Sequence, residues 1–195
     1  MTDEMFCFQC QQTAHNEKCN GKAGVCGKKS DTAKAQDELI GALIGLAKAA
    51  EYGAPTDCTD RLVLKGLFTT ITNVNFNTHT VKELTAEGKD EKRRIYKNHV
   101  DDYELSRLWE AGEDIRSLKS LILFGIKGMA AYAYHALALG KTDREVNAFF
   151  YMALRAIEGE NDPDKLLRLV LKTGEVNFKC MALLDNANTE SYGDP

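Results

Sequence analysis

The sequence predicts an all-α protein, and three observations support this fold class. Only three prolines occur among its 195 residues, so few positions exclude a helix. Long stretches are rich in Ala, Leu, Lys and Glu, which have high helix propensity. Beyond residue 29, apolar residues recur three or four positions apart, the spacing that places them on one helix face. We expect about six helices and no strand.

The first three expected helices cover roughly residues 30–52, 58–74 and 80–100. Ser30 and Asp31 are candidate N-terminal caps of the first, which ends at the break YGAPTDCTD. The second is expected to end within TNVNFNTHT, because Asn and Thr side chains compete for backbone hydrogen bonds. The third is strongly charged, and we interpret its charges as a solvated face.

The last three expected helices cover roughly residues 114–139, 142–159 and 163–188. The first of these is the most apolar, and its many small residues would let a neighbouring helix approach closely. In the second, Thr142 is the expected N-cap, and Glu145 three positions on completes the pattern of a capping box. The third begins with a proline, which is favoured in the first turn of a helix.

The six helices suggest two three-helix bundles, over residues 30–100 and 101–195. A loop over residues 1–29, rich in glycine and cysteine and without helical periodicity, precedes them. A chain of this length can bury one substantial core or two small cores packed together. We therefore expect a cysteine-rich loop supported by two helical bundles.

The charge and the apolar pattern bear on partners and location. A net charge of −4 argues against a broad nucleic-acid interface, which needs clustered Lys and Arg. The longest apolar stretch is interrupted by Lys127 and His135, so we expect no membrane-spanning helix. We identify no signal-peptide pattern at the start. The expected location is the cytoplasm, where thiols are kept reduced.

Four of the six cysteines lie close together near the start, at Cys7, Cys10, Cys19 and Cys26. In a reducing compartment, disulfides are the weakest interpretation. Four thiolates suit tetrahedral zinc, although zinc ribbons usually have two Cys-x2-Cys pairs and this stretch has one. An iron–sulfur cluster also needs four converging thiolates, and one unevenly spaced loop can wrap it. We favour an iron–sulfur cluster and keep zinc and unligated thiols as alternatives.

The charges in the cysteine-rich loop agree with a metal cluster. Lys18, Lys22, Lys28 and Lys29 are opposed by Glu17 alone. A thiolate-ligated iron–sulfur cluster is negative, so neighbouring ammonium groups would stabilise it. Three glycines in the loop would let backbone N–H groups approach the sulfur atoms, which tunes the reduction potential.

The other cysteines and histidines are weaker candidates. Cys58 and Cys180 lie in or beside helical patterns, and we expect both to be small buried hydrophobes. His15 is a candidate hydrogen-bond donor to a cluster sulfur, although an exposed side chain is the favoured interpretation. His135 is interpreted as a hydrogen-bonded histidine in the core or at its rim.

Five stretches together resemble the hybrid cluster protein family, also called prismane proteins or hydroxylamine reductases. They are MFCFQCQQTA, GVCGK, GLFTTITNVNF, DIRSLKSLILFGIKGMAAYAYHA and MALLDNANTESYGDP. The resemblance runs over the whole chain, and the first and fourth stretches are its most specific parts. It implies an oxidoreductase that reduces hydroxylamine to ammonia and water, with nitric oxide as a further proposed substrate.

The resemblance also implies cofactors. Cys7, Cys10, Cys19 and Cys26 match the four cysteines that bind a conventional cluster in the family. The expected type is a [4Fe-4S] cubane, with [2Fe-2S] as the alternative. A second, hybrid iron–sulfur–oxygen cluster lies in α/β domains that follow the helical region in family members. No residue of this chain is assigned to it.

The expected function is therefore the N-terminal electron-transfer domain of a hydroxylamine reductase. It would take electrons from an external donor protein and relay them to the C-terminal catalytic domains of the parent enzyme. We expect this chain alone to be inactive, because it lacks the hybrid-cluster ligands. Two alternatives are a free-standing iron–sulfur electron carrier or redox sensor, and a zinc-binding or structural helical domain. A homodimer is a further assembly to consider.

Overall fold

A computed structural model describes residues 6–10 and 18–194. Within these residues the fold is helical, and an isolated bridge is its one β-type pairing, which confirms the all-α class. The helices are α1 (Ser30–Tyr52), α2 (Asp57–Thr69), α3 (Thr78–Ile95), α4 (Ser106–Glu110), α5 (Glu113–Ala138), α6 (Arg144–Gly159) and α7 (Pro163–Tyr192).

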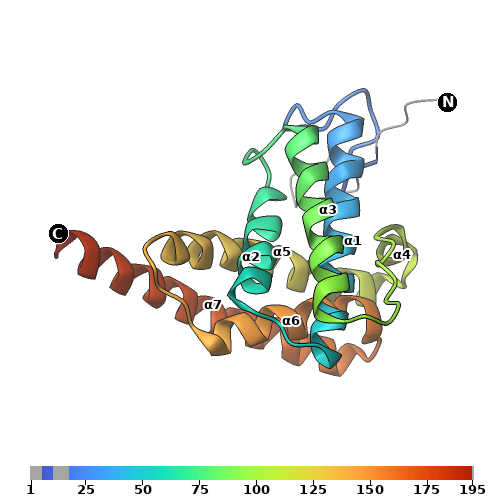
Figure 1. The fold of residues 1–195 in the computed structure, drawn as a ribbon. Helices are drawn as coiled ribbons and strands as arrows, with labels where there is room; N and C mark the ends of the chain where they lie inside the picture. The colour runs from blue at the N-terminus through green and yellow to red at the C-terminus, as the bar shows by residue number, and fades with distance from the viewer. Residues whose placement is uncertain (1–5, 11–17, 195) are drawn as a thin grey trace.

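The helices pack in two groups. Helices α1, α2 and α3 contact one another, and so do α5, α6 and α7, while α1 against α6 and α2 against α5 join the groups. Figure 1 shows α1 and α3 running steeply across α6 and α7. One apolar core continues through both groups. The division into separate bundles at residues 100 and 101 stays a prediction.

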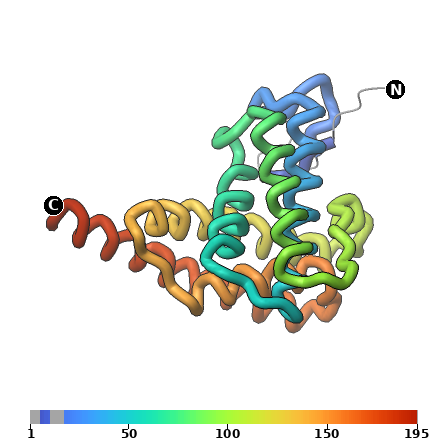
Figure 2. Tube along the Cα trace, in the orientation of Figure 1, coloured from blue at the N-terminus to red at the C-terminus, as the bar shows by residue number. Residues whose placement is uncertain are grey.

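The N-terminal loop lies at one end of the first group. The trace in Figure 2 shows residues 18–29 at the end where α1 begins, next to the 70–77 connection between α2 and α3. The Thr32 and Thr78 hydroxyls, at the starts of α1 and α3, are 2.8 Å apart. The C-terminal end of α7 lies far from this loop. The loop is therefore supported by helix ends and a connection rather than by helix sides alone.

Helix α5 is long and apolar enough to cross a membrane by length and composition, which the sequence interpretation did not anticipate. It packs against α2, α6 and α7, and core residues such as Ile122, Ile126 and Met129 are fully buried in the protein. These contacts are those of the central core helix of a globular fold.

Several helix ends differ from the sequence-based expectations. Helix α2 ends at Thr69 rather than near 74, where the Thr70 hydroxyl donates to the Leu67 carbonyl and Asn73 adopts φ 66°. Helix α3 ends at Ile95 rather than near 100. The short helix α4 lies in a segment for which no helix was expected. Local side-chain hydrogen bonds and tertiary packing set these boundaries.

The expected N-caps of two helices were wrong by one or two residues. The cap of α6 is Asp143, not Thr142, and its carboxylate accepts from the amides of Glu145 at 2.8 Å and Val146 at 3.0 Å. The cap position of α1 is Lys29, so Ser30 and Asp31 lie inside the helix. Asp is as good a cap as Thr, so composition alone could not choose between neighbours.

A partly buried hydrogen bond between the two helix groups gives a first prediction. The Tyr151 hydroxyl of α6 donates to a carboxylate oxygen of Asp60 of α2 over 2.6 Å. A hydrogen bond to a charged group contributes more than a neutral one, so Tyr151→Phe should lower the free energy of unfolding by about 2 kcal/mol. Urea unfolding followed by circular dichroism measures this. Tyr132→Phe, at an exposed α5 position, is the control, and equal losses in both variants would contradict the prediction.

Candidate metal centre

Two of the four loop cysteines face each other across the isolated antiparallel bridge. The amide of Cys7 donates to the carbonyl of Cys19 over 3.0 Å, and the amide of Cys19 donates to the carbonyl of Cys7 over 2.9 Å. Both residues are 6% exposed and pack with Ala33 of α1 in a small apolar cluster. Because directly opposed residues project to the same side, the bridge places two thiols together against the start of α1.

The third cysteine of the loop, Cys26, lies in a glycine turn. The amide of Gly24 donates to the carbonyl of Lys28, and the amide of Gly27 donates to that of Gly24, each over 2.8 Å. Gly27 has φ +84°, in the left-handed region that favours glycine. Cys26 is half-buried, and the turn fixes its backbone at the approach to α1.

The structure brings only part of the predicted ligand set together. All four loop cysteines are free thiols, and Cys10 is half-buried. Within residues 6–10 and 18–194, no three His, Cys, Asp or Glu side chains lie close enough to hold a metal ion. Residues 11–17, which join Cys10 to the Cys19 segment and include His15, lie outside the described part. The four-cysteine ligand set therefore stays a prediction.

Aromatic packing holds the first loop segment against α4 and α5. The Phe8 ring is tilted against the Trp109 ring of α4, with 4.7 Å between ring centroids, and stacks near Phe124 of α5, with 6.3 Å. Phe6 also lies 6.0 Å from Trp109. The short helix α4 thus supplies an apolar platform beside the bridged cysteines.

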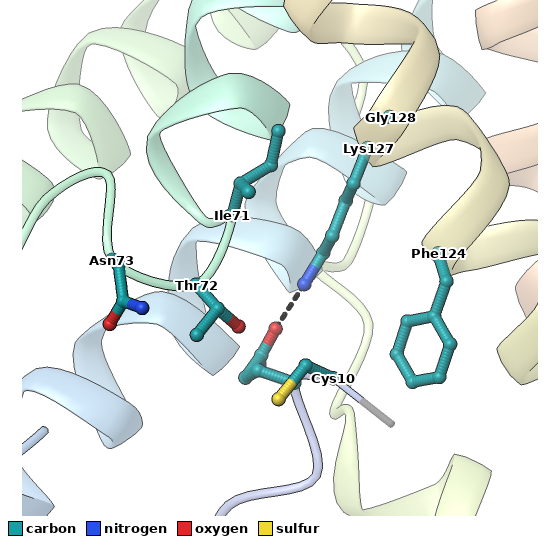
Figure 3. Close-up of a pocket in the computed structure, with 8 residues that line it drawn as sticks. Cys10, Ile71, Thr72, Asn73, Phe124, Lys127 and Gly128 are labelled. Atoms are coloured by element: carbon teal, nitrogen blue, oxygen red, sulfur yellow. Dashed lines mark hydrogen bonds between the residues drawn. The ribbon is translucent and has the colours of Figure 1, made fainter. Parts of the chain in front are cut away.

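A buried polar network lies directly beneath the loop. Gln9, which lies between Cys7 and Cys10 in the sequence, is 3% exposed. Its side-chain oxygen accepts from the Lys127 ammonium of α5, and its side-chain nitrogen donates to the Asp37 carboxylate of α1. In Figure 3, the dashed line that starts at Lys127 and ends near Cys10 marks the first of these bonds. The Gln9 side chain therefore links the segment from Cys7 to Cys10 to α1 in one helix group and to α5 in the other.

A second buried lysine lies in the same region. Lys28, just after the glycine turn, is 1% exposed, and its ammonium donates to the side-chain oxygen of Gln36 on α1. The Gln36 side-chain nitrogen donates in turn to the Asn75 carbonyl over 3.1 Å. This chain of bonds joins the cysteine loop to the connection before α3.

The buried charges do not balance. Among residues 6–10 and 18–194, the buried Lys28 and Lys127 ammonium groups lie near one carboxylate, that of the half-buried Asp37, so one positive charge is in excess in this part of the chain. Burial and the neighbouring Lys28 charge lower the pKa of Lys127 to about 7. Burial raises the pKa of Asp37 to about 6 and also raises the pKa of the Cys7 thiol. Buried charges are normally paired, so this region suits an added anion.

A pocket of about 310 Å³ opens beside Cys10. Figure 3 shows Lys127, Phe124 and Gly128 of α5 on one side of it, with Thr72 and Asn73 of the α2–α3 connection facing them. A Cβ atom at Gly128 would meet nothing within 4 Å. Of the four loop cysteines, only Cys10 lines this pocket, so the pocket lies beside the candidate centre rather than at its middle.

The four-cysteine ligand set and the stabilising role of the loop lysines stay predictions, and the polar network was not expected from the sequence. Lys18, Lys22 and Lys29 are exposed, whereas Lys28 is buried. Lys127 was seen only as an interruption of an apolar helix. A single lysine in an apolar helix indicates a buried polar contact, but its hydrogen-bond partner Gln9 is too distant in the sequence to be identified from it.

The remaining candidates have structural roles in the described part of the chain. Cys180 is fully buried on α7, as expected, and burial raises its pKa to about 12. The expectation for Cys58 was wrong, because it is exposed in the first turn of α2. His135 is exposed, with its Nδ1 atom 2.6 Å from the Ala131 carbonyl and its ring edge against Phe68.

By their chemistry the residues present fit a thiolate-ligated cluster, although the structure brings only Cys7 and Cys19 together. Four free thiols occur within one loop, Cys7 and Cys19 are buried, and the buried Lys28 and Lys127 lie beneath them. A metal bound by four thiolates is an anion, so it would offset the charge of Lys28 and Lys127. Zinc with four thiolates is also anionic, so charge alone does not choose between zinc and iron.

Comparison with known proteins supplies the family. The model of the Prismane/CO dehydrogenase family matches residues 5–195. The chain is 38% identical to a hydroxylamine reductase of Petrotoga mobilis, over 98% of this chain and 42% of that protein. It is 40% identical to one of Caldanaerobacter subterraneus subsp. tengcongensis (98% and 41%) and 38% identical to one of Nitratidesulfovibrio vulgaris (98% and 40%).

The similarity confirms the resemblance seen in the sequence motifs. It covers a much larger share of this chain than of the relatives. Nearly all of this chain is matched, yet it spans only about two fifths of the length of these relatives. The matched residues include the cysteine-rich loop and every helix of the described fold. The chain belongs to the Prismane/CO dehydrogenase family.

Proposed function

We propose that this chain is the iron–sulfur electron-transfer region of a hydroxylamine reductase. The observation that carries the proposal is the pair of bridged, buried cysteines above two buried lysines, in a chain of this family. Cys7, Cys10, Cys19 and Cys26 would hold the cluster. A [4Fe-4S] cubane is the proposed type, as the family resemblance implies, although four cysteines ligate [2Fe-2S] and [4Fe-4S] clusters alike.

The bound cluster would supply reversible one-electron chemistry. The residues of this chain would hold it and control its surroundings: the buried Ala33 would cover the bridged cysteines and Phe8 would pack the loop against Trp109. The Gln9 amide and the buried lysines would fix loop position and charge. Electron transfer needs proximity and matched potentials, so no acid or base is required in this region. The cytoplasm is the proposed location.

The relatives' name points to the reaction of the whole enzyme. We propose that an external donor protein reduces the cluster, and that electrons pass on to further catalytic domains that reduce hydroxylamine to ammonia and water. The ligands of that second centre are not assigned to any residue of this chain. The proposed role here is relay, not catalysis.

A reductive titration tests the relay. The chain is reconstituted anaerobically with ferrous iron and sulfide and then titrated with dithionite. We expect reversible bleaching of the visible absorption and an electron paramagnetic resonance signal from a reduced cluster. We also expect no hydroxylamine consumption by the chain alone. A reconstituted chain that cannot be reduced, or one that converts hydroxylamine to ammonia, would contradict the proposal.

A further inference from the structure

We propose that Lys127 and Asp37, which hold the Gln9 side-chain amide between them, are positioning residues for the cluster loop. Their opposite charges shift the reduction potential of the cluster in opposite directions. This inference rests on the proposed function, because it needs a cluster in the loop. It concerns residues outside the cysteine-rich segment, on α5 and α1. The geometry beneath Cys7 and Cys10 leads to it.

The first step is the orientation of Gln9. An amide side chain has an acceptor and a donor end, and here the oxygen faces the Lys127 ammonium while the nitrogen faces the Asp37 carboxylate. The reverse orientation would place donor against donor and acceptor against acceptor. The two charges therefore fix the amide, and the amide fixes the backbone between Cys7 and Cys10.

The second step is the exclusion of water. Lys127 is 4% exposed and Gln9 is 3% exposed, so little solvent separates the Lys127 ammonium from the loop, whereas Asp37 is half-buried. In such surroundings the effective dielectric constant is well below that of water, and charges act over longer distances. The Lys127 charge therefore acts on Cys7 and Cys10 with little screening by solvent.

The third step is the sign of each effect. Reduction adds an electron, so it makes a thiolate-ligated cluster more negative. The Lys127 ammonium favours the reduced form and raises the reduction potential, whereas the Asp37 carboxylate favours the oxidised form and lowers it. Buried charge and hydrogen bonding near the sulfur ligands are recognised determinants of cluster potential. Removing the two charges separately should therefore shift the potential in opposite directions.

The test compares three single variants and one double variant of the full chain after anaerobic reconstitution with iron and sulfide. Lys127→Met removes the positive charge and keeps an unbranched side chain, and Asp37→Asn removes the negative charge and keeps an acceptor for Gln9. Lys119→Met is the matched control. Lys119 lies on α5, is 3% exposed and donates to Asn161 over 3.0 Å, away from the loop.

The measured quantity is the ratio of reduced to oxidised cluster at one set solution potential and one pH. We expect Lys127→Met to lower this ratio about tenfold, which corresponds to about 59 mV for a one-electron couple. Asp37→Asn should raise it, and Lys119→Met should leave it unchanged. The Lys127→Met and Asp37→Asn double variant should return toward the unsubstituted chain.

The outcomes separate this inference from the proposed function. If the unsubstituted chain takes up no iron and sulfide, the proposed function is wrong and the inference is wrong with it. If it holds a cluster but Lys127→Met and Asp37→Asn shift the ratio in the same direction, or not at all, only the inference is overturned. Should Lys127→Met fail to fold, Asp37→Asn still tests the inference. A ratio of reduced to oxidised cluster that does not rise in this variant would overturn it.

Discussion

Replacing Cys19 with serine is expected to abolish the visible absorption of the cluster. Cys19 lies opposite Cys7 in the bridge, and the bridge is formed by backbone groups that serine retains. The substitution therefore removes a sulfur ligand while the local backbone keeps its hydrogen bonds. With three thiolates left, one iron of a cubane has no protein ligand. Absorption and iron per chain, measured after anaerobic reconstitution, should both fall to near background.

The two cysteines outside the loop provide matched controls for this substitution. Cys58→Ser changes an exposed thiol on α2, and Cys180→Ala changes a buried one on α7. Neither should change iron or sulfide per chain, although Cys180→Ala leaves a small cavity. If Cys19→Ser retained the absorption of the unsubstituted chain, the four-cysteine ligand set would be wrong.

Replacing Gly41 with alanine is expected to cause the largest loss of stability. Gly41 lies on the buried face of α1, and its carbonyl accepts a hydrogen bond from the Tyr103 amide over 3.1 Å. A Cβ atom at Gly41 would overlap the Tyr103 carbonyl oxygen, which is backbone and cannot turn aside as a side chain would. Overpacking of this kind costs about 3 kcal/mol, which urea unfolding would measure.

Gly174 provides the control for the glycine substitution. It lies inside α7, is exposed, and has nothing within 4 Å of its Cβ position. Alanine has the higher helix propensity, so Gly174→Ala should raise the free energy of unfolding by about 0.5–1 kcal/mol. If Gly41→Ala were as stable as the unsubstituted chain, the close approach of the Tyr103 segment to α1 would be wrong.

The helical fold could be predicted because its determinants are local. Apolar residues at helical spacing specify α1 and α5 without knowledge of their partners, and Pro163 marks the start of α7. Helix ends were less accurate, since Thr142 and Asp143 are both good caps and the surrounding backbone selects one. Helix α4 is too short to show a periodicity, so packing against the loop aromatics was needed to identify it.

The candidate site was predictable only where it is contiguous in sequence. Four cysteines in one short stretch predict a metal centre from the sequence alone, and that ligand set stays a prediction. The support beneath them is not contiguous, because Gln9, Asp37 and Lys127 lie on three separate segments that only the folded chain brings together. The burial of Lys28 likewise depends on Gln36, which lies two turns into α1.

The central claim is that the N-terminal cysteines hold an iron–sulfur cluster. Metal and acid-labile sulfide analysis of the chain, expressed with iron supplied and purified without oxygen, tests it most directly. The account predicts iron and sulfide in equal amounts, with the stoichiometry of a four-iron cubane and little zinc. A helical, folded chain that carries zinc, or neither iron nor sulfide, would contradict it.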